Sequence, residues 1–575
     1  MVLLKGRELF IAMIAAIFII GFITILSFDG GMNRGGDNPL PQKWRKVGVQ
    51  PKVETTTTTT STYVNLQNTG NQINQGNQNI EGGGQGTQYD KNRRKLPRIK
   101  KGQVNPFNKI DKVYKENEDL NKKRSLLIRE EMKFSWEKYR EFAWGYDELK
   151  PVEKRGHDWF GLGLSIVDSL DTLYLMGLDK EYKEGKDWVE NVLNHRKDTG
   201  KKVSVFETTI RFLGNYNTMY SLTGEQLYLD LGRDIADLLL YAFNDHSPFP
   251  ASFVSLTDHK VSYQRWAGDC IILCEPASML LELNELSRIT GDPKYKEYSD
   301  KIVDALASMK PSIPGLYPTF ITQDGKGFCN NKISVGAMGD SFYEYLLKMW
   351  IYQDGIEERY SELFQLSADA IIEHLYKVSK KGDGFITNLD GGSVSNTQEH
   401  LTCFAGGMFM LAAASNITGD DEKSALYMEV GEKVTRTCAK TYDITPTGLG
   451  PEIAYIEPDS GDIRFNGYKA DSSYILRPET IESIFVAYRL TGNTEYQEMA
   501  WKIFQAIVDV CKTEHGYVGL NDVSNSWAFQ DFQQSFFLAE TLKYLYLTFQ
   551  PSSLVPLDKY VFNTEAHPIE IQYKD

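Results

Sequence analysis

Four carboxylates stand at similar places in the sequence, each ahead of a glycine turn. The separation from the following glycine is 13 to 17 residues in each case: Glu207 to Gly224, Glu275 to Gly291, Asp340 to Gly355 and Glu479 to Gly492. Helices commonly end at such glycines. The spacing therefore places the four carboxylates near the starts of equivalent helices, at one end of the fold.

Two carboxyl groups in one pocket are sufficient to cleave a glycosidic bond, because one protonates the leaving oxygen while the other activates water or attacks directly. The chain has no G-x-S-x-G, H-E-x-x-H or Walker motif. Acidic residues in a first helical turn also complement the helix dipole, which explains part of the pattern without chemistry. Arg211, Arg477 and His400 accompany the carboxylates, however, and this assembly suits a sugar better than a helix cap. We therefore expect glycoside hydrolysis.

The elements that must position these residues are helical hairpins. Apolar residues recur at helical spacing over 342–350 and 481–490. Short Gly-bounded β-like loops, such as 315–318 and 516–519, mark the end of each hairpin opposite the glycine turn. Repeated hairpins stack as an open solenoid or a closed ring. We expect a closed all-α toroid of six or seven hairpins, because the aromatic tail at 560–562 is typical of a plug.

Charge and composition exclude several classes of protein. The formal net charge is −14, which argues against a nucleic-acid binder. Hydrophobic residues make up 41% of the chain, enough for a large core. Six cysteines are too few for a disulfide scaffold but allow one or two bridges in an oxidising compartment.

The N-terminal region predicts a single-pass membrane protein. Residues 9–28 lack charge and are long enough to span a bilayer, so we expect a transmembrane signal anchor there. The preceding residues 1–8 carry Lys5 and Arg7, which favours a cytosolic tail. Residues 29–110 have the low-complexity composition of a lumenal stalk, which either tethers the next domain or has no role. The folded domain then covers 111–575, with a glycosylation sequon at Asn416.

Seven segments of the folded part together resemble one enzyme family. They are residues 165–173 (SIVDSLDTL), 206–211 (FETTIR), 339–348 (GDSFYEYLLK), 399–404 (EHLTCF), 476–482 (LRPETIE), 537–543 (FLAETLK) and 561–568 (VFNTEAHP). The family is that of the class I α-1,2-mannosidases, glycoside hydrolase family 47. The resemblance implies an (α/α)7 barrel, a calcium ion at its base, and inverting removal of α-1,2-linked mannose from high-mannose N-glycans.

The same resemblance implies roles for individual residues. Glu207 resembles the general acid, Glu479 the base that activates water, and Asp340 the third essential carboxylate. Substrate-contacting positions of the family are matched by Arg211, Glu275, His400, Arg477 and Phe536. Thr564 resembles the calcium ligand, with Glu482, Glu540 and Glu565 as an outer, water-bridged shell, and a hard cation such as Ca²⁺ suits such oxygen ligation.

The assignments contain an electrostatic tension. Arg211 lies four residues after Glu207, so a helix lets them pair, and this pairing would lower the pKa of a group that must donate a proton. Burial and neighbouring carboxylates must outweigh the pairing, or Arg211 must turn toward the substrate.

The cysteines and one cleft residue add further expectations. Cys403 and Cys438 lie in segments that resemble those joined by the family's disulfide. Cys270 and Cys274 are one helical turn apart, a poor geometry for a bridge, so we expect two buried thiols, whereas Cys329 and Cys511 have no assignable role. Met338 stands where members that remove a single mannose carry Arg, which favours Golgi-type trimming from Man9 towards Man5.

Two other functions remain open at this level. A catalytically weak, mannosidase-like lectin of glycoprotein quality control would keep the barrel but lose a carboxylate, the disulfide or the calcium residue, and this chain retains all three. The second alternative is an α/α toroid that acts on another polysaccharide. The sequence leaves undetermined the choice between Golgi and endoplasmic reticulum membrane, the order of trimming and the oligomeric state.

Overall fold

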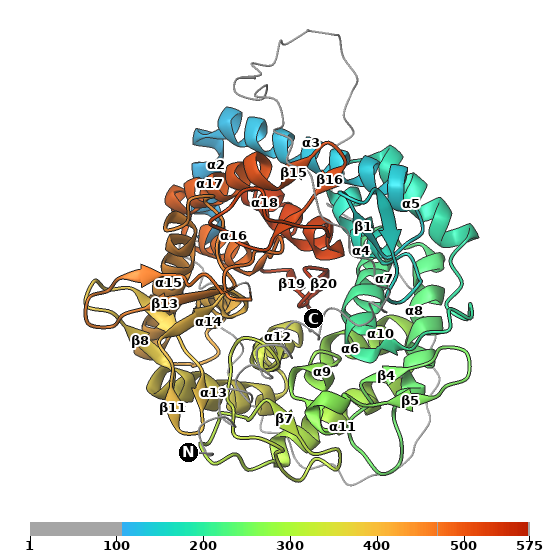
Figure 1. The fold of residues 1–575 in the computed structure, drawn as a ribbon. Coiled ribbons are helices and arrows are strands. Elements are labelled where there is room, and N and C mark those ends of the chain that lie inside the picture. The colour runs from blue at the N-terminus through green and yellow to red at the C-terminus, as the bar shows by residue number, and fades with distance from the viewer. Residues whose placement is uncertain (1–105, 469, 573–575) are drawn as a thin grey trace, which may run out of the picture. The chain divides into compact units, whose positions relative to one another are not determined.

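The computed structural model describes residues 106–572 except residue 469, and these residues form a ring of paired helices (Figure 1). Seven segments line the inside of the ring: α4 (Leu164–Leu175); α6 (Val205–Thr208) continuing through one π-helical turn, η1 (Thr209–Leu213), into α7 (Gly214–Thr223); α9 (Cys274–Ala277) with α10 (Leu280–Thr290); α12 (Asp340–Tyr352); α14 (Phe404–Ser415); α16 (Glu479–Thr491); and the π-helical η5 (Phe537–Thr541) with α18 (Leu542–Thr548). The inner segments are buried on almost every side, as their apolar composition predicts.

Seven outer helices surround them: α3 (Glu118–Ala143), α5 (Asp179–Asn191), α8 (Gln226–Leu239), α11 (Lys294–Ser308), α13 (Glu358–His374), α15 (Asp421–Asp443) and α17 (Thr494–Cys511). Each outer helix buries one face and exposes a charged one. The last inner segment packs against the first pair, η5 on α4 and α18 on α3. The ring is therefore closed, with seven hairpins among the described residues, and a short helix α2 (Pro106–Glu116) packs on α16.

Glycine turns connect each inner helix to the outer helix that follows. Their φ angles are positive, from 62° to 71°, at Gly177, Gly224, Gly291, Gly355, Gly419 and Gly492. Glycine adopts this left-handed conformation at little cost, which is why it commonly follows the end of a helix. In the Leu-Thr-Gly turn, the Thr223 hydroxyl donates to the Met219 carbonyl and accepts from the Glu225 amide, at 2.6 and 3.2 Å. The predicted helix ends are confirmed.

Short antiparallel strands occupy the opposite connections, from outer to inner helix. They are β1 (Glu148–Lys150), β2 (Arg155–His157), β3 (Val203–Ser204), β4 (Phe253–Val254), β5 (Val261–Ser262), β6 (Ile271–Ile272), β7 (Phe320–Ile321), β8 (Tyr376–Val378), β9 (Gly384–Ile386), β10 (Leu389–Asp390), β11 (Ser393–Val394), β12 (Thr397–Glu399), β13 (Ile453–Ile456), β14 (Ile463–Arg464), β15 (Lys512–Thr513), β16 (Gly516–Tyr517), β17 (Gly519–Leu520) and β18 (Phe529–Gln530). The longest sheets have three strands, β3-β4-β5 and β12-β13-β14. These loops immediately precede the inner helices, so they surround the end where those helices begin.

A C-terminal hairpin fills the centre of the ring (Figure 1). Strands β19 (Tyr560–Phe562) and β20 (Pro568–Glu570) pair in antiparallel fashion, and they pack against α12 and α7. The Phe562 ring lies edge-on to that of Phe485 in α16, with centroids 5.7 Å apart. The expected plug is confirmed.

The structure contains two disulfides. Cys403–Cys438 joins the start of α14 to α15 and confirms the pairing implied by the resemblance. Cys270 pairs with Cys329, so the expectation that Cys270 is a buried thiol is wrong. The helical argument failed because Cys270 lies in the loop before β6, and pairing of β6 with β7 brings the 320–329 loop alongside. Cys274, the first residue of α9, is a buried free thiol as expected. Cys511, for which the sequence indicated no role, is also a buried free thiol.

The predicted cytosolic tail (1–8) and signal anchor (9–28) lie outside the described residues, as does nearly all of the stalk (29–110). Within the described part of the chain, no helix is long and apolar enough to cross a membrane. The predicted glycosylation acceptor Asn416 is the residue that ends α14, with φ of 55°.

Candidate active site

The predicted site residues lie at the starts of inner helices. Glu207 is in α6, Glu275 is the second residue of α9, and Asp340 and Glu479 are the first residues of α12 and α16. His400 and Phe536 directly precede the 3₁₀ turn η4 (Leu401–Cys403) and η5, respectively. Because every inner helix follows an outer-to-inner connection, all these starts lie at one end of the ring.

Two neighbouring side chains, His400 and Arg477, lie beside the carboxylate of Glu479. Its Oε2 lies 3.0 Å from Nδ1 of His400, and its Oε1 lies 3.6 Å from Nη1 of Arg477. Burial alone would raise the pKa of Glu479, but the His400 hydrogen bond and the positive charge of Arg477 outweigh it and lower the pKa below its usual value. Glu479 is therefore a carboxylate over the whole neutral range.

Asp340 has the opposite electrostatic environment. Its Oδ1 accepts from the backbone amide of Ser341 at 2.8 Å. Burial nevertheless raises the pKa of Asp340 to about 7, assisted by the negative charges of Glu344 and Glu479. The negative charge of Glu479 acts on Asp340, so the starts of α12 and α16 lie near each other.

Arg211 joins Glu207 to the base of the site. The Arg211 Nε donates to Glu207 Oε2 at 2.9 Å, as the four-residue spacing predicts. Its Nη1 is bonded to Glu565 and lies 3.4 Å from Asp168 Oδ2. One guanidinium charge is thus divided among three carboxylates. Arg211 is therefore only partly committed to Glu207.

Glu275 and Arg477 complete the polar wall. Burial raises the pKa of Glu275 to about 7, and the charge of Glu207 acts in the same direction. The side-chain amide of Gln264 donates to Glu275 Oε1 at 3.2 Å. Arg477 forms a bidentate pair with Glu452, at 2.7 and 2.8 Å. These contacts orient both side chains before any substrate binds.

Phe536 supplies an apolar surface beside these charges. Its ring is 5.8 Å from the Arg211 guanidinium carbon. Phe536 is buried at the start of η5, directly after Ser535, whose hydroxyl accepts a hydrogen bond from Arg211 at 2.9 Å. An aromatic face beside charged groups suits the apolar side of a sugar ring.

Three residues with strained backbone lie next to the site. Met338, Leu476 and Ala566 have φ angles of 73°, 69° and 59° without being glycine. They lie beside Asp340, Arg477 and Glu565, respectively. Strain of this kind persists where surrounding structure enforces it, and it is enriched at functional sites.

A buried acidic cluster lies beneath the catalytic residues, beside Thr564. Burial, partly opposed by Lys348, raises the pKa of Glu482 to about 8. Burial and neighbouring carboxylates also raise the pKa of Glu540 and of Glu565 well above its usual value. Such shifts identify carboxylates that lack enough positive charge around them.

The composition of this cluster fits a hard divalent cation. Among the described residues, no three carboxylate, histidine or cysteine side chains are placed to hold a metal directly. The residues that the resemblance implies, Thr564 with Glu482, Glu540 and Glu565, offer oxygen atoms only. Ca²⁺ accepts such oxygen ligands, whereas Zn²⁺ prefers nitrogen and sulfur.

Several residues of this site escaped the sequence reasoning. Asp168, Glu344, Lys348 and Tyr442 contact the predicted residues or their partners. Lys348 is buried and pairs with Glu344, its i−4 neighbour, and lies 3.7 Å from Glu482. A lysine four residues after a glutamate in an otherwise apolar helix is a signal that the sequence does contain.

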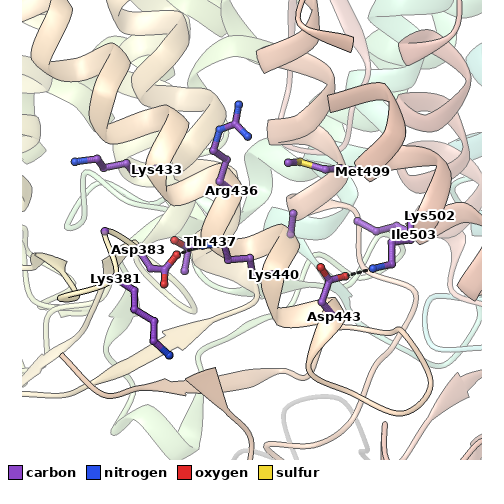
Figure 2. A pocket seen from close by; sticks show the side chains of 12 residues that line it. Lys381, Asp383, Lys433, Arg436, Thr437, Lys440, Asp443, Met499, Lys502 and Ile503 are labelled. Atoms are coloured by element: carbon purple, nitrogen blue, oxygen red, sulfur yellow. Dashed lines mark hydrogen bonds and ion pairs between the residues drawn. The ribbon is translucent and has the colours of Figure 1, made fainter. Parts of the chain in front are cut away.

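A second hollow lies on the outer wall, between α15, α17 and the turn from β8 to β9 (Figure 2). Its cationic side chains are Lys381, Lys433, Arg436, Lys440 and Lys502. Each is paired with a carboxylate: Lys381 with Asp462, Lys433 with Glu429, Arg436 with Glu495, Lys440 with Asp383 and Lys502 with Asp443. The charges that line this hollow are therefore compensated within the protein.

Comparisons with known proteins agree on one family. The profile of glycosyl hydrolase family 47 matches residues 131–571. The chain is 41% identical over 457 residues to mannosyl-oligosaccharide alpha-1,2-mannosidase IA of Drosophila melanogaster, covering 78% of this chain and 67% of the relative. It is 39% identical over 464 residues to mannosyl-oligosaccharide 1,2-alpha-mannosidase IB of Homo sapiens, covering 79% and 71%. The solved alpha-1,2-mannosidase from Trichoderma reesei matches with a TM-score of 0.71 at 32% identity, over 78% of this chain and 99% of that one.

Proposed function

Since the chain belongs to glycosyl hydrolase family 47, we propose that it is a mannosyl-oligosaccharide 1,2-alpha-mannosidase that removes terminal α-1,2-linked mannose from high-mannose N-glycans with inversion. The observation that carries the role of Glu479 as the base is the contrast between carboxylates at one end of the ring. Glu479 is held ionised by His400 and Arg477, whereas burial raises the pKa of Asp340 and Glu275 to about 7.

Glu479 acts as the general base. It takes a proton from a water molecule as that water forms a bond to the anomeric carbon of the terminal mannose. Glu207 gives its proton to the departing glycosidic oxygen as the old carbon–oxygen bond breaks. One proton is therefore gained by Glu479 and one lost by Glu207, and the released mannose has the opposite anomeric configuration. Asp340 supplies the third carboxylate beside them.

Substrate orientation is assigned to the polar wall around these groups. Glu275, Arg211, His400 and Arg477 offer hydrogen-bonding groups, and Phe536 offers an aromatic face. Most of these polar side chains are already ordered by contacts inside the protein. The entropy of ordering them is therefore not lost when the sugar binds.

Thr564 would hold a calcium ion, with Glu482, Glu540 and Glu565 bonded through water. When bound, this ion supplies positive charge to the acidic cluster and an oxygen-binding position at the base of the pocket. Within the protein, Arg211 and Lys348 supply the remaining compensation, because Arg211 bonds Glu565 and Lys348 lies 3.7 Å from Glu482.

The place of action that we propose is the secretory pathway, in the Golgi or endoplasmic reticulum membrane, with residues 9–28 as a type II anchor. Two disulfides suit an oxidising lumen. Met338 is half-buried, uncharged and two residues before Asp340. Such a side chain leaves room for several glycan branches, which supports trimming from Man9 towards Man5.

Time-resolved proton NMR of released mannose tests the mechanism. The full chain is mixed with a nine-mannose glycan, and β-mannose is expected to appear before mutarotation produces the α anomer. Glu479→Gln should lower kcat by about 10² to 10⁴-fold, and Glu373→Gln, whose side chain is 76% exposed, should not.

If α-mannose were formed first, the reaction would retain the anomeric configuration. Glu479 would then not be a separate base that activates water. Binding of the glycan by folded protein without any release of mannose would instead support the lectin function.

A further inference from the structure

His400 lies between Glu479 and a second residue, Tyr442, which the mechanism above does not use. Tyr442 is in the last turn of α15, and its hydroxyl oxygen is 2.7 Å from Nε2 of His400. On the other side of the ring, Nδ1 is 3.0 Å from Oε2 of Glu479. The side chains of Tyr442 and His400 are almost completely buried, so this chain of contacts is shielded from water.

The direction of each hydrogen bond follows from the partners. An ionised carboxylate only accepts, so Nδ1 of His400 carries a hydrogen and donates it to Glu479. Burial and the negative charge of Glu479 raise the pKa of Tyr442 far above its usual value, so Tyr442 keeps its hydroxyl hydrogen. The other hydroxyl near Nε2, that of Thr480, is more distant at 3.4 Å. Tyr442 is therefore the main donor available to Nε2.

We propose that Tyr442 is a positioning residue that donates to Nε2 of His400 and thereby keeps the imidazole neutral with its hydrogen on Nδ1. This proposal rests on the role of Glu479 given above. Which nitrogen carries the hydrogen is set by the bond that the other nitrogen makes. With Tyr442 in place, the tautomer that can donate to Glu479 is the favoured one.

The consequence for the reaction concerns the two oxygens of Glu479. His400 occupies one lone pair of Oε2, so Oε2 is the more engaged of the two oxygens. Oε1 faces Arg477 at 3.6 Å, too long for a good hydrogen bond. We assign Oε1 as the atom that accepts the proton of the attacking water.

The ring of Tyr442 is itself held in place by aromatic packing. Its centroid is 5.8 Å from that of His400 and 6.1 Å from that of Tyr474, both in edge-on geometry. Tyr442→Phe keeps these contacts and removes only the donor. The variant therefore isolates the hydrogen bond from the packing.

Two measurements on the full chain test the proposal. Labelling histidine with ¹⁵N reports which ring nitrogen of His400 is protonated, and His400→Gln identifies its signals. Tyr442→Phe should convert part of the Nδ1–H form to the form with hydrogens on both ring nitrogens. It should also lower kcat about tenfold, equivalent to about 1.4 kcal/mol, with KM changed less than twofold. In the His400→Gln background, Tyr442→Phe should cause no further loss.

Tyr427→Phe is the matched control, because Tyr427 is buried in the same helix and its hydroxyl bonds Asp369 at 2.7 Å, away from the site. It should change neither the protonation of His400 nor kcat. Unchanged His400 protonation in Tyr442→Phe, or a raised KM with unchanged kcat, would overturn the proposal. The ¹⁵N measurement uses the resting protein, so it stands whether or not the proposed mannosidase activity is found.

Discussion

At the scale of single residues, the site separates carboxylates by their neighbours. Glu479 has a histidine and an arginine within reach, whereas Asp340 and Glu275 have mainly burial and other carboxylates. Chemically similar side chains therefore have opposite pKa shifts. This separation keeps Glu479, the assigned base, ionised at a pH where Asp340 and Glu275 are partly protonated.

The pH dependence of activity should expose this arrangement. In Arg477→Gln, loss of the positive charge favours the neutral form of Glu479, so the pKa of Glu479 rises. The base is then lost at a higher pH, and the acidic limb of the kcat/KM profile should move upward. Initial rates on a nine-mannose glycan between pH 4 and 8 measure this limb.

Arg436→Gln is the control for that experiment, because it removes an arginine–glutamate pair on the outer wall (Figure 2). Its profile should match that of the unmodified chain. If Arg477→Gln lowered activity by the same factor at every pH, Arg477 would contact substrate without tuning Glu479.

At the scale of elements, the loops between outer and inner helices must be rigid, because each one sets where a catalytic helix begins. The loop before α4 shows how this is achieved. The buried carboxylate of Asp147 accepts five backbone hydrogen bonds, from Trp159, Phe160, Gly161, Leu162 and Leu164. One side chain thus fixes the whole segment that leads into the ring.

Asp147→Asn should therefore destabilise the fold markedly. The amide group has one accepting oxygen, so it turns a nitrogen toward two or three of the buried donors. We expect a loss of about 2 to 4 kcal/mol in the free energy of unfolding. Denaturant unfolding followed by circular dichroism measures the change.

Asp459→Asn provides the comparison, because the Asp459 side chain is 95% exposed and pairs only with an exposed lysine. It should change stability by less than about 0.5 kcal/mol. Equal effects of the two substitutions would show that the Asp147 carboxylate does not hold the loop.

At the scale of the whole molecule, the closed ring gathers charges from distant parts of the chain around one axis. Glu482, Glu540 and Glu565 come from two inner helical segments and the central hairpin. Lys348 and Arg211 are the cations that reach them. The cluster has more carboxyl groups than cations, and a bound cation would stabilise their ionised forms.

Removal of that cation should lower both activity and thermal stability. A ligand at 100 times its Kd adds about 2.7 kcal/mol to the folded state. Chelation followed by calorimetry should therefore lower the Tm, and added Ca²⁺ should restore it. In Thr564→Val the Tm should no longer respond to chelator or to Ca²⁺. Full activity and an unchanged Tm in verified metal-free protein would refute the metal site.

The sequence predicts local features well because they depend on neighbouring residues. Glycine turns, helix starts and the aromatic plug follow from residue type and spacing, and the structure has them where expected. The Arg211–Glu207 pair is also local, since four residues of helix bring the two together. Cys270 was misassigned because a strand pairing, rather than its own helix, selects Cys329 as its partner.

The sequence by itself determined the family, the repeated helical hairpins and the carboxylates at their starts. Only the tertiary structure decided how these groups are paired: Arg211 shared among three carboxylates, Tyr442 behind His400, and Lys348 beside Glu482. Spacing along a helix specifies which residues share a face. Ring closure brings together residues hundreds of positions apart, and the hydrogen bonds and charges that set each pKa depend on those long-range contacts.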